Sequence, residues 1–73
     1  MKSSLTKTII SENHYLFLGQ WIYLLHQDGT RQKKKINFIG NGNFEFNGGW
    51  GEVKDLTINE NSKSSIKYEL KKF

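Results

Sequence analysis

Glycine-containing dipeptides divide this sequence into short segments. Asp28-Gly29 and Asn41-Gly42 are typical of the two-residue loops that join the strands of β-hairpins, and Gly48-Gly49 marks a third reversal. A type I′ hairpin turn needs a positive φ at both central residues, a conformation that asparagine, aspartate and glycine adopt most readily. The positions of these dipeptides therefore predict a series of short strands joined by tight hairpins.

The segments between the turns alternate apolar and polar residues, as half-buried strands do. The stretch 43–47 reads NFEFN, with both phenylalanines on one side, and the stretch 65–72 alternates in the same way. We therefore expect one all-β domain, an antiparallel meander of five or six strands that forms a strongly curved sheet or a small barrel. The residues expected to form its core are Trp21, Leu25, Ile36, Phe38, Phe44, Phe46, Leu56, Ile58, Ile66, Tyr68 and Leu70.

The first third of the chain is less regular. The stretch Tyr15–His26 is apolar on both faces, which predicts a central strand covered by the core on one side and by the N-terminal segment on the other. Gly19 predicts a bend or a bulge that divides two strands. Residues 1–13 form a lead-in segment in which Leu5, Ile9 and Ile10 stand at roughly helical spacing. Two alternatives remain open for it, a short N-terminal helix and a frayed tail. The β-meander domain is expected to occupy residues 14–73.

The composition excludes several classes of protein. The 73-residue chain has no cysteine, so it offers no disulfide, thiolate metal site or cysteine nucleophile. No apolar run approaches the roughly 20 residues of a membrane span, and the N-terminus lacks the apolar stretch of a signal peptide. We therefore expect a cytoplasmic protein with no membrane partner. A domain of this size buries only about 60% of its unfolded surface, so a homodimer is also compatible with the composition.

No arrangement of residues in the sequence predicts catalysis. Glu45, Glu52 and Asp55 lack the marks of a catalytic carboxylate pair, and the glycine-rich segments GNG and GGWG match no phosphate-binding loop. His14 and His26 would be roughly 40 Å apart in a fully extended strand, so a shared metal site is not expected. We expect a non-enzymatic protein with no cofactor and no bound metal.

Several short motifs resemble small bacterial lipocalin-like β-modules. Gly19-Gln20-Trp21 looks like the G-x-W of lipocalins and their smaller relatives. Such modules lay out successive hairpins in a fixed order of motifs, which here are Ile36 and Phe38, Asn41-Gly42, Trp50, and Leu56 and Ile58. The pattern is also similar to short accessory β-modules that accompany some bacterial polysaccharide-biosynthesis proteins. The likeness covers residues 16–70.

The resemblance implies a curved antiparallel sheet more than it implies a ligand. A lipocalin barrel has about eight strands, and this chain has too few to enclose a large ligand cavity. In such a module Gly19 would let the chain bend and Trp21 would plug one end of the sheet, a structural role.

The basic run Arg31, Lys33, Lys34 and Lys35 is the sharpest charged feature. The chain has 11 basic and 7 acidic residues, and its net charge of +4 comes entirely from residues 1–40. A basic strand could follow a phosphate backbone while a neighbouring aromatic ring stacks on unpaired bases. The alternative is an edge strand whose lysines prevent sheet-to-sheet aggregation.

Trp50 is the second candidate for a binding site. It stands among glycines in GGWG, where an exposed ring could stack on a sugar or a base or anchor a protein interface. The alternative, which the small size of the domain favours, is a position in the core.

These features predict a small binding or interaction module for a protein or carbohydrate partner. Two alternatives remain open. One is a small nucleic-acid-binding β-barrel that uses Arg31 and Lys33–Lys35 with a neighbouring aromatic residue. The other is an accessory or inhibitory protein that docks a larger enzyme through an edge strand.

Overall fold

Strands make up nearly all of the regular structure. The computed structural model describes residues 5–71, and within this range no helix is long and apolar enough to cross a membrane. The elements in chain order are β1 (Lys7–Ser11), β2 (His14–Phe17), β3 (Trp21–Leu25), β4 (Arg31–Gly40), β5 (Asn43–Phe46), β6 (Gly49–Glu52), the 3-10 helix η1 (Val53–Asp55), β7 (Leu56–Ile58) and β8 (Tyr68–Lys71).

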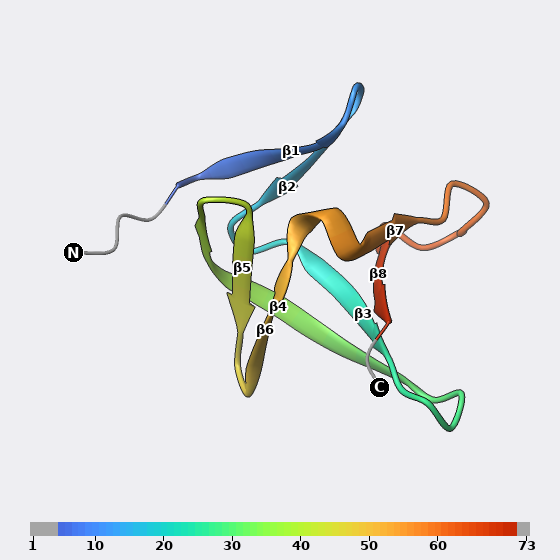
Figure 1. Cartoon of the computed structure of the whole chain (residues 1–73). Helices are drawn as coiled ribbons and strands as arrows, with labels where there is room; N and C mark the ends of the chain where they lie inside the picture. The colour runs from blue at the N-terminus through green and yellow to red at the C-terminus, as the bar shows by residue number, and fades with distance from the viewer. Residues whose placement is uncertain (1–4, 72–73) are drawn as a thin grey trace.

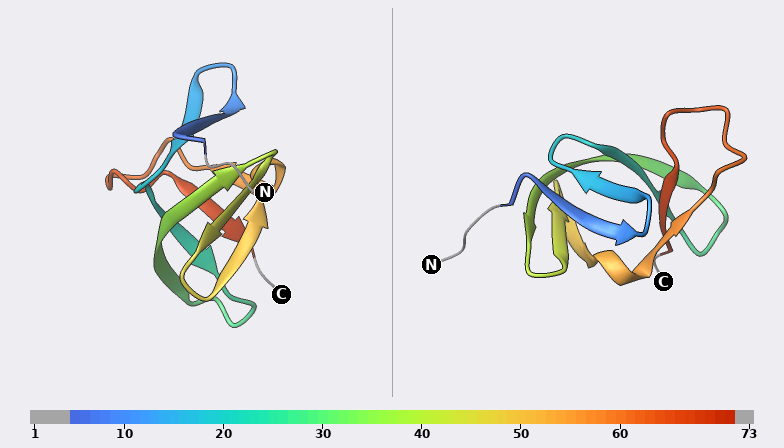
Figure 2. Two further views of the ribbon diagram at one scale, coloured as in Figure 1. Left: turned by 90° about the vertical axis from the view of Figure 1, so that its left-hand side faces the viewer. Right: turned by 90° about the horizontal axis from the view of Figure 1, so that it is seen from above.

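Six of these strands form one curled sheet in the order β6-β5-β4-β3-β8-β7 (Figure 1). From β3 to β6 each strand pairs antiparallel with the next, which is the expected meander. The chain then passes through η1 into the β7–β8 hairpin, and β8 pairs in parallel with β3 at the other side of the meander. The sheet curls into a half-barrel (Figure 2), so the all-β fold with a strongly curved sheet is confirmed.

The N-terminal segment is a β-hairpin. β1 pairs antiparallel with β2, with Thr8 opposite Leu16 and Ile9 opposite Tyr15. The alternative of a short helix is therefore wrong for the described part of this segment, whose first four residues lie outside the described range. Ile10 packs against the core and Ile9 faces solvent, as neighbours on a strand do. The hairpin spans the expected boundary between lead-in and meander, and it lies along one side of the curled sheet (Figure 2).

The apolar stretch after the hairpin is divided in two at Gly19. β2 ends at Phe17 and β3 begins at Trp21, and in the tight turn between them the Gln20 amide donates to the Phe17 carbonyl at 3.0 Å. Gly19 has a φ of +85°, which residues with a Cβ rarely adopt. The prediction that Gly19 lets the chain bend and divides two strands is confirmed.

The hairpin turns follow the sequence prediction at one position and depart from it at another. Asn41-Gly42 has φ values of +50° and +81°, which fits the predicted type I′ turn. At Asp28-Gly29 only the glycine has a positive φ, so the predicted type I′ turn is wrong there. The Thr30 hydroxyl and amide donate to the Asp28 carboxylate at 2.7 and 3.0 Å, and these bonds stabilise the alternative loop and lower the pKa of Asp28.

Along β3 the core differs from the expected one. Ile22 and Leu24 are buried, whereas Trp21 is 42% exposed and Leu25 is half-buried. Every residue of this strand is aliphatic or aromatic, so no alternation marks its inward side. Two expectations are therefore wrong: that Trp21 and Leu25 belong to the core, and that Trp21 plugs one end of the sheet.

A β-bulge in β4 reverses the alternation halfway along the strand. Ile36 is opposite Phe46, and the next partner, Glu45, is opposite Phe38, so one extra residue of β4 is inserted between them. Beyond the bulge Ile39 faces inward and is fully buried, while Phe38 is only half-buried. The expectation that Phe38 belongs to the core is therefore wrong.

The other expected core residues lie where they were predicted. Gly51 completes the interior, because a Cβ there would lie 2.8 Å from Cδ2 of Leu70 and 2.9 Å from Cζ of Phe44. Leu16 and Val53 are buried in addition to the expected residues. The confirmed core positions are Ile36, Phe44, Phe46, Leu56, Ile66, Tyr68 and Leu70, with Ile58 partly buried against them.

We predict that Ile39→Ala lowers the free energy of unfolding by about 2–5 kcal/mol, because it empties a fully buried site. Phe38→Ala removes a larger side chain from a half-buried position and should cost less. Urea unfolding followed by circular dichroism measures both. If Ile39→Ala does not fold, Ile39→Val should still lose about 0.5–1.5 kcal/mol. A larger loss for Phe38→Ala would contradict the bulge.

Candidate functional site

The outer side of β3 and the first half of β4 carries aromatic rings beside cations. In the antiparallel register Trp21 is opposite Lys35 and Tyr23 is opposite Lys33. Residues paired in this way point to the same side of a sheet, and that side is outward because the alternate residues of β3 are buried. We call the outward set Trp21, Tyr23, Arg31, Lys33 and Lys35 the aromatic–basic face.

Within the aromatic–basic face the cations lie over the rings. The Lys33 and Lys35 ammonium groups are 4.9 and 5.9 Å from the centre of the Trp21 ring, and the Arg31 guanidinium is 5.9 Å from the centre of the Tyr23 ring. These are cation–π distances, which at exposed sites contribute about 0.5–1 kcal/mol each. The lysine side chains are flexible, so a ligand can displace them from the ring without unfolding the strand.

One end of the aromatic–basic face is partly neutralised. Glu69 of β8 lies beside it, with a carboxylate oxygen 3.6 Å from the Arg31 guanidinium. Within residues 5–71 no carboxylate forms an ion pair with Lys33 or Lys35. The positive potential of the face is therefore centred on these two lysines, next to Trp21.

Lys34, which the sequence places in the same basic run, points to the other side of β4. Its ammonium group donates to the Asn47 carbonyl at 3.2 Å and lies 5.9 Å from the centre of the Phe46 ring. The run of four basic residues is thus divided by strand alternation. β4 pairs with β5 only from Ile36 onward, so Arg31–Lys35 has a neighbouring strand only on the β3 side. The expectation that these lysines protect an edge strand from aggregation stays a prediction.

Trp50 does not join the aromatic–basic face. It lies on β6, which is separated from β4 by β5, and its opposite residue is Glu45. The ring is 55% exposed, so the expectation of a core position is wrong and the alternative of an exposed ring is confirmed. The physical reason is that Gly51 takes the inward position on β6, where any side chain would collide with the core.

The two histidines lie in separate hydrogen-bonded contacts. His26 Nε2 is 3.1 Å from Oε1 of Gln32 across the β3–β4 hairpin. His14 Nδ1 is 2.9 Å from the Ser11 hydroxyl, and its Nε2 is 2.9 Å from the Glu60 carboxylate. This chain of contacts ties the N-terminal hairpin to the loop between β7 and β8. The described residues contain no cluster of three or more groups that could hold a metal ion.

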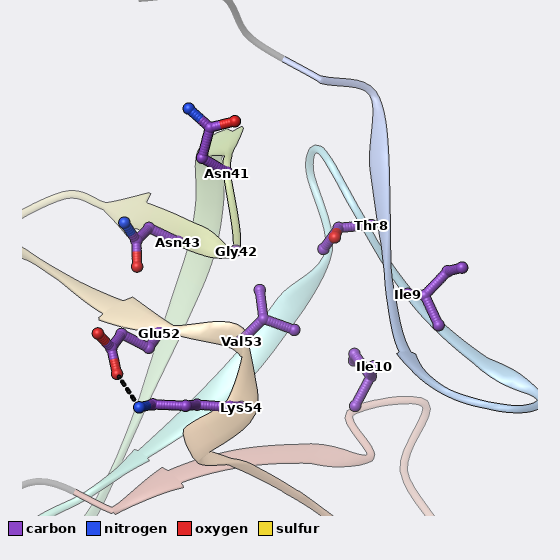
Figure 3. Close-up of a pocket in the computed structure, with 9 residues that line it drawn as sticks. All are labelled: Thr8, Ile9, Ile10, Asn41, Gly42, Asn43, Glu52, Val53 and Lys54. Carbon is purple, nitrogen blue, oxygen red and sulfur yellow. Dashed lines mark ion pairs between the residues drawn. The ribbon is translucent and has the colours of Figure 1, made fainter.

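An open groove separates β1 from the turn between β4 and β5. Its volume is about 420 Å³, and the Glu52–Lys54 ion pair, at 3.3 Å, forms part of its wall. Because this carboxylate and ammonium neutralise each other, the wall adds little net charge. The side chains and backbone that line the groove belong to Thr8, Ile9, Ile10, Asn41, Gly42, Asn43, Glu52, Val53 and Lys54 (Figure 3).

We predict that Trp21 fluorescence is quenched more strongly by iodide than by caesium, because Lys33 and Lys35 attract the anion to an exposed ring. Trp50→Phe isolates the Trp21 signal, and quenching is compared at constant ionic strength. In the Lys33→Glu/Lys35→Glu variant the preference should reverse. Equal quenching by the two ions in both proteins would contradict this arrangement.

Comparison of the chain with models of known protein families, with curated proteins and with solved structures found no match. The resemblance to lipocalin-like β-modules therefore stays a prediction.

Proposed function

We propose that this chain is a non-enzymatic binding module whose ligand is single-stranded nucleic acid, held on the aromatic–basic face. The observation that carries the proposal is the register of β3 with β4. It aligns the exposed Trp21 ring and the Tyr23 ring with Lys35 and Lys33 on one outward surface. Proteins that bind single strands combine these two elements, cations for the phosphates and rings for the bases.

The spacing of the rings favours a single strand over a duplex. Trp21 and Tyr23 are two residues apart on one strand, and that separation is about 6.6 Å. It is about twice the 3.4 Å rise per nucleotide of stacked DNA. Rings at this spacing suit unpaired bases that are splayed apart, since bases inside a duplex expose no face for stacking.

A second candidate is a binding module for a carbohydrate or protein partner, centred on Trp50. The observation that favours it is the exposure of this ring beside the Glu45 carboxylate on the neighbouring strand. Such a ligand would not depend on Lys33 or Lys35, and its affinity would change little with salt.

We predict that labelled single-stranded DNA and RNA bind at low salt and are released as salt rises. Three phosphate contacts, from Arg31, Lys33 and Lys35, imply a slope of about −2 in a plot of log affinity against log salt concentration. Lys33→Glu/Lys35→Glu should abolish the binding. Fluorescence anisotropy at several salt concentrations measures both effects.

The control for charge is Lys63→Glu/Lys67→Glu, which changes net charge equally at two exposed positions of the β7–β8 loop. This variant should retain most of the affinity. Equal losses in the two double variants would mean that net charge rather than the aromatic–basic face attracts the nucleic acid, and the proposal would be wrong.

We predict that Trp21→Ala weakens binding of a single-stranded oligonucleotide by about fivefold to about 150-fold, because stacking of one base on an aromatic ring is worth about 1–3 kcal/mol. Trp50→Ala, which removes an equally large exposed ring on β6, should leave this affinity unchanged. The same anisotropy titration measures both variants. The opposite result would place the nucleic-acid site at Trp50 and would contradict the aromatic–basic face.

A further inference from the structure

The outer side of the N-terminal hairpin repeats the arrangement of the aromatic–basic face. Tyr15 and Phe17 of β2 are 37% and 46% exposed, and their ring centres are 6.4 Å apart. On the neighbouring strand Lys7 is opposite Phe17, and its ammonium group lies 5.2 Å from the centre of the Tyr15 ring. Two outward rings on one strand are thus again accompanied by a cation from the antiparallel neighbour, and here both rings are exposed.

The two surfaces meet at Gly19. The Gly19 amide donates to the Ile36 carbonyl at 2.8 Å, which fixes this corner of the chain against β4. A Cβ on Gly19 would lie 3.8 Å from Cε of Lys35, the same lysine whose ammonium group lies over the Trp21 ring. The Lys35 side chain therefore lies at this corner, beside Gly19 and the Trp21 ring.

We infer that the nucleic-acid path continues from the aromatic–basic face past Gly19 onto the hairpin, where Lys7, Tyr15 and Phe17 form a second stacking site. This inference rests on the proposed function. The order of rings along the chain is Tyr15, Phe17, Trp21 and Tyr23, with Lys35 placed to hold a phosphate where the path turns.

The Lys7 charge favours a polyanion over an apolar partner on the outer side of the N-terminal hairpin, which we call the hairpin face. Lys7 forms no ion pair within residues 5–71, and an apolar interface that covered this face would bury its ammonium group without a counter-charge. Burying an unpaired charge is strongly unfavourable. A phosphate supplies the missing anion, while the bases cover the two rings.

The test compares the binding of a short and a long single-stranded oligonucleotide, about 4 and about 12 nucleotides, by the intact protein and by Tyr15→Thr/Phe17→Thr. Threonine keeps the strand preference at these exposed positions. The variant should bind the short oligonucleotide like the intact protein and bind the long one about tenfold more weakly or worse. The matched control is Ile9→Thr, which removes an apolar side chain, 65% exposed, from the same face but removes no ring.

The possible failures are distinguishable. If the intact protein binds neither oligonucleotide, the proposed function is wrong and the inference falls with it. If the variant binds the long oligonucleotide as tightly as the intact protein, or if Ile9→Thr loses as much affinity as the variant, the hairpin site is wrong while the proposed function stands. Sedimentation tests a further outcome. If the intact protein is a dimer and substitutions on this face (Tyr15→Thr/Phe17→Thr or Ile9→Thr) make it a monomer, the face binds a second copy of the chain and the inference is overturned.

Discussion

The antiparallel pairing of β3 with β4 determines both the interior and the exterior of this domain. On the inward side it aligns Ile22 and Leu24 with the core, and on the outward side it aligns Trp21 and Tyr23 with a row of cations. The same two strands connect the halves of the curled sheet, since β8 pairs with β3 and β5 pairs with the second half of β4. Any change in this register would alter the core and the candidate site together.

Much of the fold could be predicted from local signals. Strands with polar and apolar alternation, such as β5 and β8, have the expected inward sides, and Asn41-Gly42 forms the expected turn. The inward side of β3 could not be predicted, because all of its residues are aliphatic or aromatic. Neither could the bulge that exchanges Phe38 for Ile39, since Ile36, Asn37 and Phe38 alternate in the sequence as they would in a regular strand. The parallel pairing of β8 with β3 is a long-range contact without a local signal.

The candidate site was predictable in its charge but not in its aromatic part. The basic run identifies Arg31, Lys33 and Lys35, and strand alternation removes Lys34 from the set. Trp50 is the ring that the sequence offers for an exposed platform, with the core as the favoured alternative, yet the ring beside these cations is Trp21, a residue expected in the core. The wrong expectation for the inward side of β3 therefore concealed the site, because it placed Trp21 in the core instead of beside the cations.

The basic run also explains why β3 adopts one orientation. A strand that is apolar on both faces does not by itself specify which face is buried. Its partner favours one: the observed orientation turns only Lys34 to the inward side, where its ammonium group donates to the Asn47 carbonyl, whereas the reverse orientation would turn both Lys33 and Lys35 there. Solvation of Lys33 and Lys35 therefore also favours the outward position of Tyr23 and Trp21, their cross-strand partners. The outward position of the rings follows from the charges beside them, so one set of residues specifies which side of β3 points outward and creates the surface proposed to bind nucleic acid.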